Sequence, residues 1–212
     1  MFTLIWIGEA PASNLVKAPR QIEVQVSPSF KLGQAGSTLA YVVEIRNLGI
    51  DDLFELEARD DLGWGLKISP SRLWISSGKS EFAVLYVTLP ANAAGGSRDE
   101  IQITARGTLA KGTLADPENS SCSTTCTAEI KISRGVEVSI KPLSAFGKWA
   151  ALIKNSGNVD EVFELSAYEV LHHPRGAVRR RRASLSSQSL AVARGETKEV
   201  LISSPENTWG YK

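Results

Sequence analysis

The chain has 212 residues, enough for one large domain or two of ordinary size, each with its own hydrophobic core. Its 24 lysines and arginines nearly balance 23 aspartates and glutamates, so the net charge of +1 provides no global field to attract nucleic acid or an anionic membrane. Hydrophobic residues make up 42%, which is typical of a globular protein and excludes a disordered chain. No stretch approaches the ~20 apolar residues that a membrane-spanning helix needs.

The first residues form an apolar segment with two interpretations. The run Phe2–Ile7 lacks a basic flank and is shorter than the core of a standard signal peptide, although Ala10–Ser13 resembles a cleavage site. It is therefore the remnant of an export signal or a β-strand outside the first repeat, which its Ile, Trp and Phe content favours. As a strand, it would place Phe2, Leu4 and Trp6 on one face.

Alternation of apolar and polar residues with a period of two dominates the rest of the chain, and helical periodicity is nearly absent. Val24 and Val26, for example, alternate with Glu23 and Gln25, as in a half-buried strand. Turn-forming residues separate such segments, and short strands at this spacing predict an all-β sandwich or barrel. The expected strands are centred on residues 22–26, 41–46, 54–58, 82–89, 101–105 and 128–132.

The second half of the chain repeats the first. Val136–Pro142 reproduces Ile22–Pro28, and Lys154–Ala167 matches Arg46–Ala58 with one insertion. Agreement of this extent indicates two homologous units in series. Because the units consist of alternating strands, we expect two tandem immunoglobulin-like antiparallel β-sandwiches.

The motifs shared by the two units resemble those of a known class of modules. In the first repeat they are the Asn47-x-Gly49 element, the Phe54-Glu-Leu strand and the Gly78-Lys-Ser turn, together with a Gly63-Trp64 loop that the second repeat replaces with residues 172–176 and the arginine run. This pattern resembles the tandem immunoglobulin-like repeats of archaeal and bacterial surface proteins, in particular NEW3 and CARDB-type modules. The resemblance covers about residues 20–108 and 135–205. It implies a β-sandwich fold and an extracellular or cell-surface location, but no particular ligand.

The expected organisation is an N-terminal extension over residues 1–19, a first sandwich over 20–133 and a second over 134–212. The first repeat ends with two strands that have no counterpart after Pro205 in the second repeat. The second sandwich is therefore expected to expose an apolar groove beside unpaired backbone groups. Truncation of the chain, a smaller variant of the domain and completion by a donated strand all stay open, with Phe2–Ile7 as the candidate donor.

No motif for catalysis is present. The sequence contains no G-x-S-x-G, Walker, H-E-x-x-H or paired C-x-x-C element, so we expect neither an enzyme nor a bound cofactor. His172 and His173 are the only histidines, and neighbours on a strand point to opposite faces, which argues against shared metal ligation.

Clusters of charge provide two further candidate sites. Four carboxylates flank one expected strand and could bind calcium, with solvated turn residues as the alternative. A run of four arginines could bind an anionic glycan, lipid headgroup or phosphate as an extended loop, or be a charged surface only. The carboxylates are Asp51, Asp52, Asp60 and Asp61, and the arginines are Arg179, Arg180, Arg181 and Arg182.

The segment around residues 119–126 combines candidates for covalent modification. Cys122 and Cys126 are the only cysteines, in a Ser/Thr-rich stretch that is expected to be a loop. In an extended chain their Cα atoms would lie roughly 13 Å apart, so a disulfide would need a tight turn, and two free thiols are the alternative. Asn119 fits the acceptor pattern for N-glycosylation.

Three functions are compatible with these observations. The leading hypothesis is a structural or adhesive module of a cell-surface or secreted assembly, with other copies or neighbouring domains as protein partners. The second is a filament subunit joined by strand donation. The third is an accessory carbohydrate-binding module of a secreted glycosidase, which requires Trp64, Trp74 and Trp149 to be exposed on one face for a glycan. No nucleic-acid partner is expected.

Overall fold

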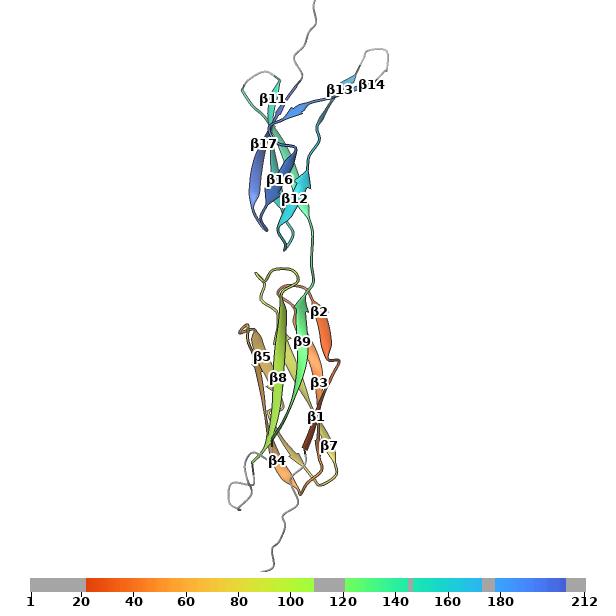
Figure 1. Cartoon of the computed structure of the whole chain (residues 1–212), viewed down its shortest axis with the longest axis vertical. Helices are drawn as coiled ribbons and strands as arrows, with labels where there is room; N and C mark the ends of the chain where they lie inside the picture. The colour runs from red at the N-terminus through yellow and green to blue at the C-terminus, as the bar shows by residue number, and fades with distance from the viewer. Residues whose placement is uncertain (1–21, 109–120, 145–146, 173–177, 205–212) are drawn as a thin grey trace, which may run out of the picture.

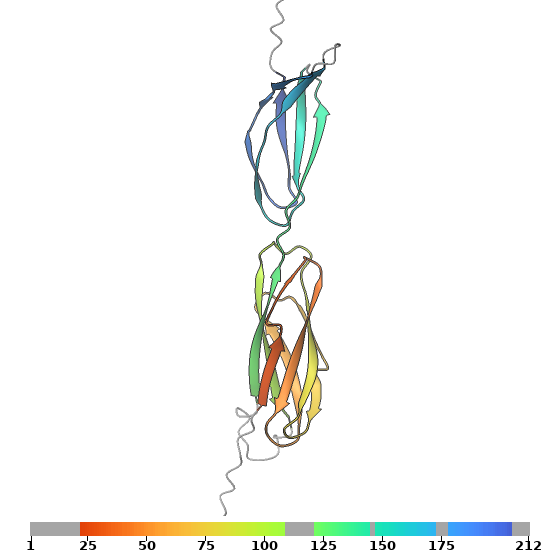
Figure 2. The same ribbon diagram turned by 90° about the vertical axis from the view of Figure 1, so that its right-hand side faces the viewer.

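The structure is a computed structural model that describes residues 22–108, 121–144, 147–172 and 178–204. All regular elements in these ranges are β-strands, arranged as two sandwiches end to end (Figures 1 and 2). The all-β fold with tandem sandwiches is thus confirmed. The described residues contain no helix that is long and apolar enough to cross a bilayer.

The first sandwich packs a four-stranded sheet against a five-stranded one, and all pairings are antiparallel except that of β2 with β9. The four-stranded sheet, in order, contains β1 (Ile22–Ser27), β3 (Thr38–Asn47), β7 (Ser80–Thr88) and β5 (Gly65–Ser69). The five-stranded sheet, in order, contains β2 (Phe30–Gly33), β9 (Ser121–Ile130), β8 (Arg98–Gly107), β4 (Asp52–Asp60) and β6 (Arg72–Ile75).

Alternate side chains of the two sheets meet in one apolar core. Ile45 and Leu85 from one sheet and Ile103 from the other are fully buried, and each contributes about 1.5–3 kcal/mol by leaving water. The buried Tyr41 connects the sheets through its hydroxyl, which donates a hydrogen bond of 2.7 Å to the carbonyl of Thr127 on β9. The period-two pattern therefore identifies the core correctly in this unit.

The second sandwich repeats the first sheet completely and the other sheet only in part. Its four-stranded sheet, in order, contains β10 (Val136–Pro142), β11 (Lys148–Asn155), β17 (Thr197–Ser203) and β15 (Ser184–Leu185). The opposite layer has the pair β12 (Glu161–Glu164) and β16 (Ser189–Val192), and a separate hairpin joins β13 (Tyr168–His172) to β14 (Val178–Arg182).

The pairing registers show which strands correspond. Val138 on β10 faces Ile153 on β11, as Val24 on β1 faces Ile45 on β3. By the same comparison, β12 and β16 take the places of β4 and β6. Within the ranges that the structure describes, nothing takes the places of β2, β8 and β9, so the described part of the second sandwich is open on one side.

A buried asparagine holds the same corner in each sandwich. The side-chain amide of Asn47 donates to the carbonyls of Ile50 and Ile75 at 2.6 and 2.8 Å. Its side-chain oxygen accepts the N–H of Gly49 at 2.9 Å. Asn155 makes the three equivalent bonds at 2.8, 3.0 and 2.9 Å. The Asn-x-Gly motif therefore joins a strand end, a turn and the opposite layer.

The junction between the sandwiches is short and hydrogen-bonded. Asn158 accepts the N–H of Ser133 at 2.8 Å with its side-chain oxygen and donates to the carbonyl of Lys131 at 2.9 Å. The N–H of Gly95, in a loop of the first sandwich, donates to the carbonyl of Asn158 at 2.9 Å. We propose that the domain boundary lies at Ser133–Gly135, between β9 and β10.

Replacing the corner asparagine tests its structural role. Asn47→Ala should lower the free energy of unfolding by roughly 2–4 kcal/mol, because the buried carbonyl of Ile75, the part-buried carbonyl of Ile50 and the amide of Gly49 lose their partner. Urea denaturation followed by tryptophan fluorescence measures the change. The exposed Asn92 provides the control, since Asn92→Ala should change stability by less than about 0.5 kcal/mol. Equal effects of the two variants would contradict this role.

A side chain at Gly95 should separate the two sandwiches. A Cβ atom there would lie 2.4 Å from Oδ1 of Asn158 and 2.9 Å from Cγ1 of Val159. We therefore expect the two halves of Gly95→Val to tumble more independently than those of the unaltered chain, as measured by ¹⁵N relaxation. Asn92→Ala in the same loop should leave the common tumbling unchanged, and unchanged tumbling of Gly95→Val would show that this contact does not couple the halves.

Candidate functional site

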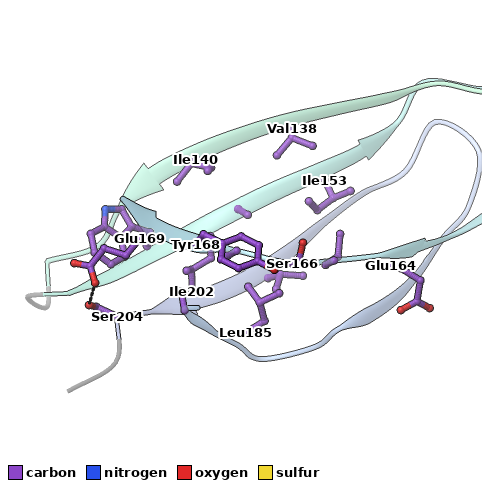
Figure 3. Close-up of a pocket in the computed structure, with 16 residues that line it drawn as sticks. Val138, Ile140, Ile153, Glu164, Ser166, Tyr168, Glu169, Leu185, Ile202 and Ser204 are labelled. Atoms are coloured by element: carbon purple, nitrogen blue, oxygen red, sulfur yellow. Dashed lines mark hydrogen bonds between the residues drawn. The ribbon is translucent and has the colours of Figure 1, made fainter. Parts of the chain in front are cut away.

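The missing strands leave an apolar cavity of about 610 Å³ in the second sandwich (Figure 3). Val138 and Ile140 of β10, Ile153 of β11 and Ile202 of β17 form part of its floor, and residues 164–167, which continue β12, form part of one wall. We call this cavity the open groove. It lies where the first sandwich has its hydrophobic core.

Equivalent valines show what the missing strands would cover. Val24 is 8% exposed, because β1 lies against β9 in the first sandwich. Val138, at the corresponding position of β10, is 58% exposed. Burial of a valine side chain stabilises a protein by about 1.5–3 kcal/mol, so the open groove withholds this contribution at several positions.

Trp149 occupies, in the open groove, the position that Tyr41 has in the first sandwich. It lies six residues before Asn155, as Tyr41 lies six residues before Asn47. Tyr41 is buried and bonds to β9, whereas Trp149 is half-buried and lines the open groove. An indole ring therefore lies at the position from which a tyrosine hydroxyl holds the closing strand of the first sandwich.

The open groove also has a backbone edge. In the first sandwich, β4 pairs with β6 on one side and with β8 on the other. In the second sandwich, β12 pairs with β16, and none of the described strands pairs with its other edge. A strand edge with free N–H and C=O groups beside apolar side chains is the arrangement that binds an extended peptide.

The arginine run forms strand β14, so its interpretation as a loop is wrong. Pairing with β13 places successive side chains on opposite faces of the hairpin. Arg181 donates to Glu169 at 2.7 Å within the hairpin. The pKa of Glu169 is lowered, chiefly by the hydrogen bond from Arg181. Ser204 donates to the same carboxylate at 3.1 Å, which fastens the hairpin to the end of β17 beside the open groove (Figure 3). Arg180 and Arg182 are exposed on the other face.

The candidate calcium ligands do not converge on one point. Asp51 and Asp52 lie at the start of β4, and Asp60 and Asp61 lie at its end, about 26 Å away for a nine-residue strand. Asp51 accepts the N–H of Ser77 at 2.7 Å, which is a turn-capping role. Among the described residues, no three His, Cys, Asp or Glu side chains gather as ligands for a metal ion.

The cysteines lie in a strand, which corrects the expected loop. Cys122 and Cys126 are both on β9, four residues apart, so their Cα atoms are held at about 13 Å and both thiols are free. Burial raises the pKa of Cys126 to about 11, which keeps the thiol protonated and unreactive. Asn119 and the apolar segment Phe2–Ile7 lie outside the described residues.

The tryptophans do not form a shared platform for sugar. Trp64 is buried in the first core, and Trp74 is exposed on β6 of the same sandwich. Trp149 lines the open groove in the other sandwich. A glycan-binding face made of all three is therefore wrong, because it requires them to be exposed side by side.

Sequence reasoning missed a buried carboxyl pair in the first sandwich. Asp99 on β8 is buried next to Asp60, whose carboxylate also accepts the N–H of Trp64 at 2.6 Å. Burial and the neighbouring Asp60 raise the pKa of Asp99 to about 6. The signal was present in the sequence, since Asp99 is in phase with the buried Ile101 and Ile103.

This pair predicts a pH-dependent stability. The raised pKa of Asp99 means that its contribution is most favourable below about pH 4, where it is protonated in both states, and is lost as pH rises through about 6. Asp99→Asn mimics the protonated form, so its advantage in unfolding free energy over the unaltered chain should grow between about pH 4 and 7. Urea titrations at several pH values measure it, and a pH-independent difference would contradict the raised pKa.

Comparisons with known proteins give fold-level similarities only. No family model matches the chain, and no curated protein matches it. Among solved structures, the Escherichia coli chaperone DraB is 10% identical, with 87% of each chain covered and a TM-score of 0.38. A PapD-like domain of human CEP192 is 13% identical, covering 60% of this chain and 97% of that one, with a TM-score of 0.38. At such scores, the fold class follows from the strands described above and not from these similarities.

Proposed function

We propose that this chain is a non-enzymatic structural module of a cell-surface or secreted assembly, and that its second sandwich binds protein by accepting strands. The observation that carries this proposal is the open groove, which combines exposed apolar side chains with the free edge of β12. An extended segment placed there would gain main-chain hydrogen bonds and burial together.

The rest of the chain is consistent with a spacer that presents this groove. The hydrogen bonds of Asn158 and Gly95 connect the two sandwiches directly through a short junction. The first sandwich therefore restrains the position of the second. The acceptor pattern at Asn119 and the resemblance to surface-protein repeats support an extracellular location. No described feature favours catalysis or a metal cofactor.

Filling the open groove in cis tests the proposal. A copy of residues 88–133, which contain β8 and β9, is appended after Ser204 in place of residues 205–212. The graft should stabilise the second sandwich by roughly 3 kcal/mol or more and abolish its binding of the apolar dye ANS, because it covers Val138 and Ile140. Calorimetry and dye fluorescence provide the readouts.

A matched graft shows whether the closing strands act through their apolar face. The control carries Asp at the positions that copy Ile101, Ile103 and Ala128, which are buried in the first sandwich. It should neither stabilise the second sandwich nor reduce dye binding. If both grafts give the same stability and fluorescence, the open groove does not accept strands.

A further inference from the structure

We infer that the natural occupant of the open groove is the segment Phe2–Ile7 of a second copy, so that copies join head to tail. This inference rests on the proposed strand-accepting function and names its partner. It also gives a role to an apolar segment that belongs to neither repeat.

The first sandwich shows which chemistry fits the groove. The inward residues of β8 and β9 are small or medium-sized and apolar at every second position, from Ile101 to Ala105 and from Cys126 to Ile130. Phe2–Ile7 has no charged residue and offers Phe2, Leu4 and Trp6 on one face; these side chains are larger, as a single strand needs in order to fill the cavity of about 610 Å³ that two strands leave. As a strand it would span about 20 Å, close to the roughly 23 Å of the seven-residue β10.

The connectivity of the tandem supplies the geometry of a head-to-tail joint. Strand β9 runs towards the junction and continues through residues 131–135 into β10, the first strand of the next sandwich (Figure 1). A strand with the same direction in the open groove would leave at the far end of the second sandwich. Phe2–Ile7 precedes β1, the first strand of a sandwich, just as β9 precedes β10.

A neighbouring copy reaches the groove more easily than the chain reaches its own. Strand β1 begins at the end of the first sandwich remote from the second (Figures 1 and 2). Residues 8–21 span at most about 50 Å, so insertion into the same chain would stretch them along the whole first sandwich and across the junction. Between two copies stacked head to tail, residues 8–21 need to cross only the boundary from one copy to the next. Such an interface joins two different surfaces and does not close, so it builds filaments.

The groove offers backbone hydrogen-bonding edges as well as an apolar lining, so it can bind a whole strand. The free edge of β12 offers backbone donors and acceptors on one side, and β10 pairs only with β11 among the described strands. The half-buried indole of Trp149 adds a large apolar surface for the strand to cover. Because Phe2–Ile7 has no charged side chain, its insertion does not incur the free-energy cost of removing a charge from water.

Assembly of the full chain tests this inference. Protein whose residues 1–12 are verified by intact mass is studied by electron microscopy and sedimentation velocity. The donor variant Leu4→Asp/Ile5→Asp and the groove variant Ile140→Asp should each lose filaments. Leu201→Asp is the matched control, because Leu201 is 47% exposed on β17, away from the β12 edge, and does not line the groove; it should assemble normally.

A mixture of the two defective variants gives the sharper result. The groove variant keeps its donor segment and the donor variant keeps its groove, so the mixture should form discrete dimers with one joint. Each variant alone should bind itself at least roughly tenfold more weakly than it binds the other.

The possible outcomes separate the two proposals. Filaments that form equally well without residues 1–12, or a mixture that gives no dimers, would overturn the head-to-tail inference. If the cis graft still stabilises the second sandwich in that case, the strand-accepting function stands with another occupant. If the graft also fails, both proposals fall.

Discussion

A β-sandwich is stable only when its two sheets pack against each other, because each sheet buries the apolar face of the other. The first unit meets this condition with nine strands in two layers. The second unit has a complete four-stranded sheet, but the layer opposite it is reduced to β12 and β16 beside a hairpin. Its main features, from the exposure of Val138 to the half-buried Trp149, follow from that imbalance.

The second unit keeps its fold because its anchors do not depend on the missing strands. Asn155 makes its three hydrogen bonds within the strands and turns that remain, and Gly195 donates its N–H to the carbonyl of Asn155 as Gly78 does to that of Asn47. A small core around Ile153 and Ile202 is retained. The hairpin, fastened through Glu169, encloses one end of the groove. An acceptor can therefore be folded before its strand arrives.

Most of the strands and the core of the first sandwich can be predicted from the local alternation of apolar and polar residues. The alternation around Val24 predicts strand and core, and the internal repeat reveals which strands are missing, so the open groove was predictable from the comparison of Val24 with Val138. The predictions that failed concern segments whose structure depends on pairing with distant strands. The stretch around Cys122 has the composition of a loop but pairs with β8, and the run around Arg181 pairs with β13, because tertiary context overrides propensity. The correspondence of Trp149 with Tyr41 could be recognised only from the strand registers of both repeats.

The most direct measurement concerns the methyl groups of the groove floor. In methyl-labelled protein, relaxation by a soluble paramagnetic probe reports how far water reaches Val138 and Ile140, with the buried Val24 as an internal reference. The account predicts strong relaxation of both residues in the chain without residues 1–12, and protection close to that of Val24 in the assembled full-length chain. Equal relaxation of these residues in the two samples would contradict it.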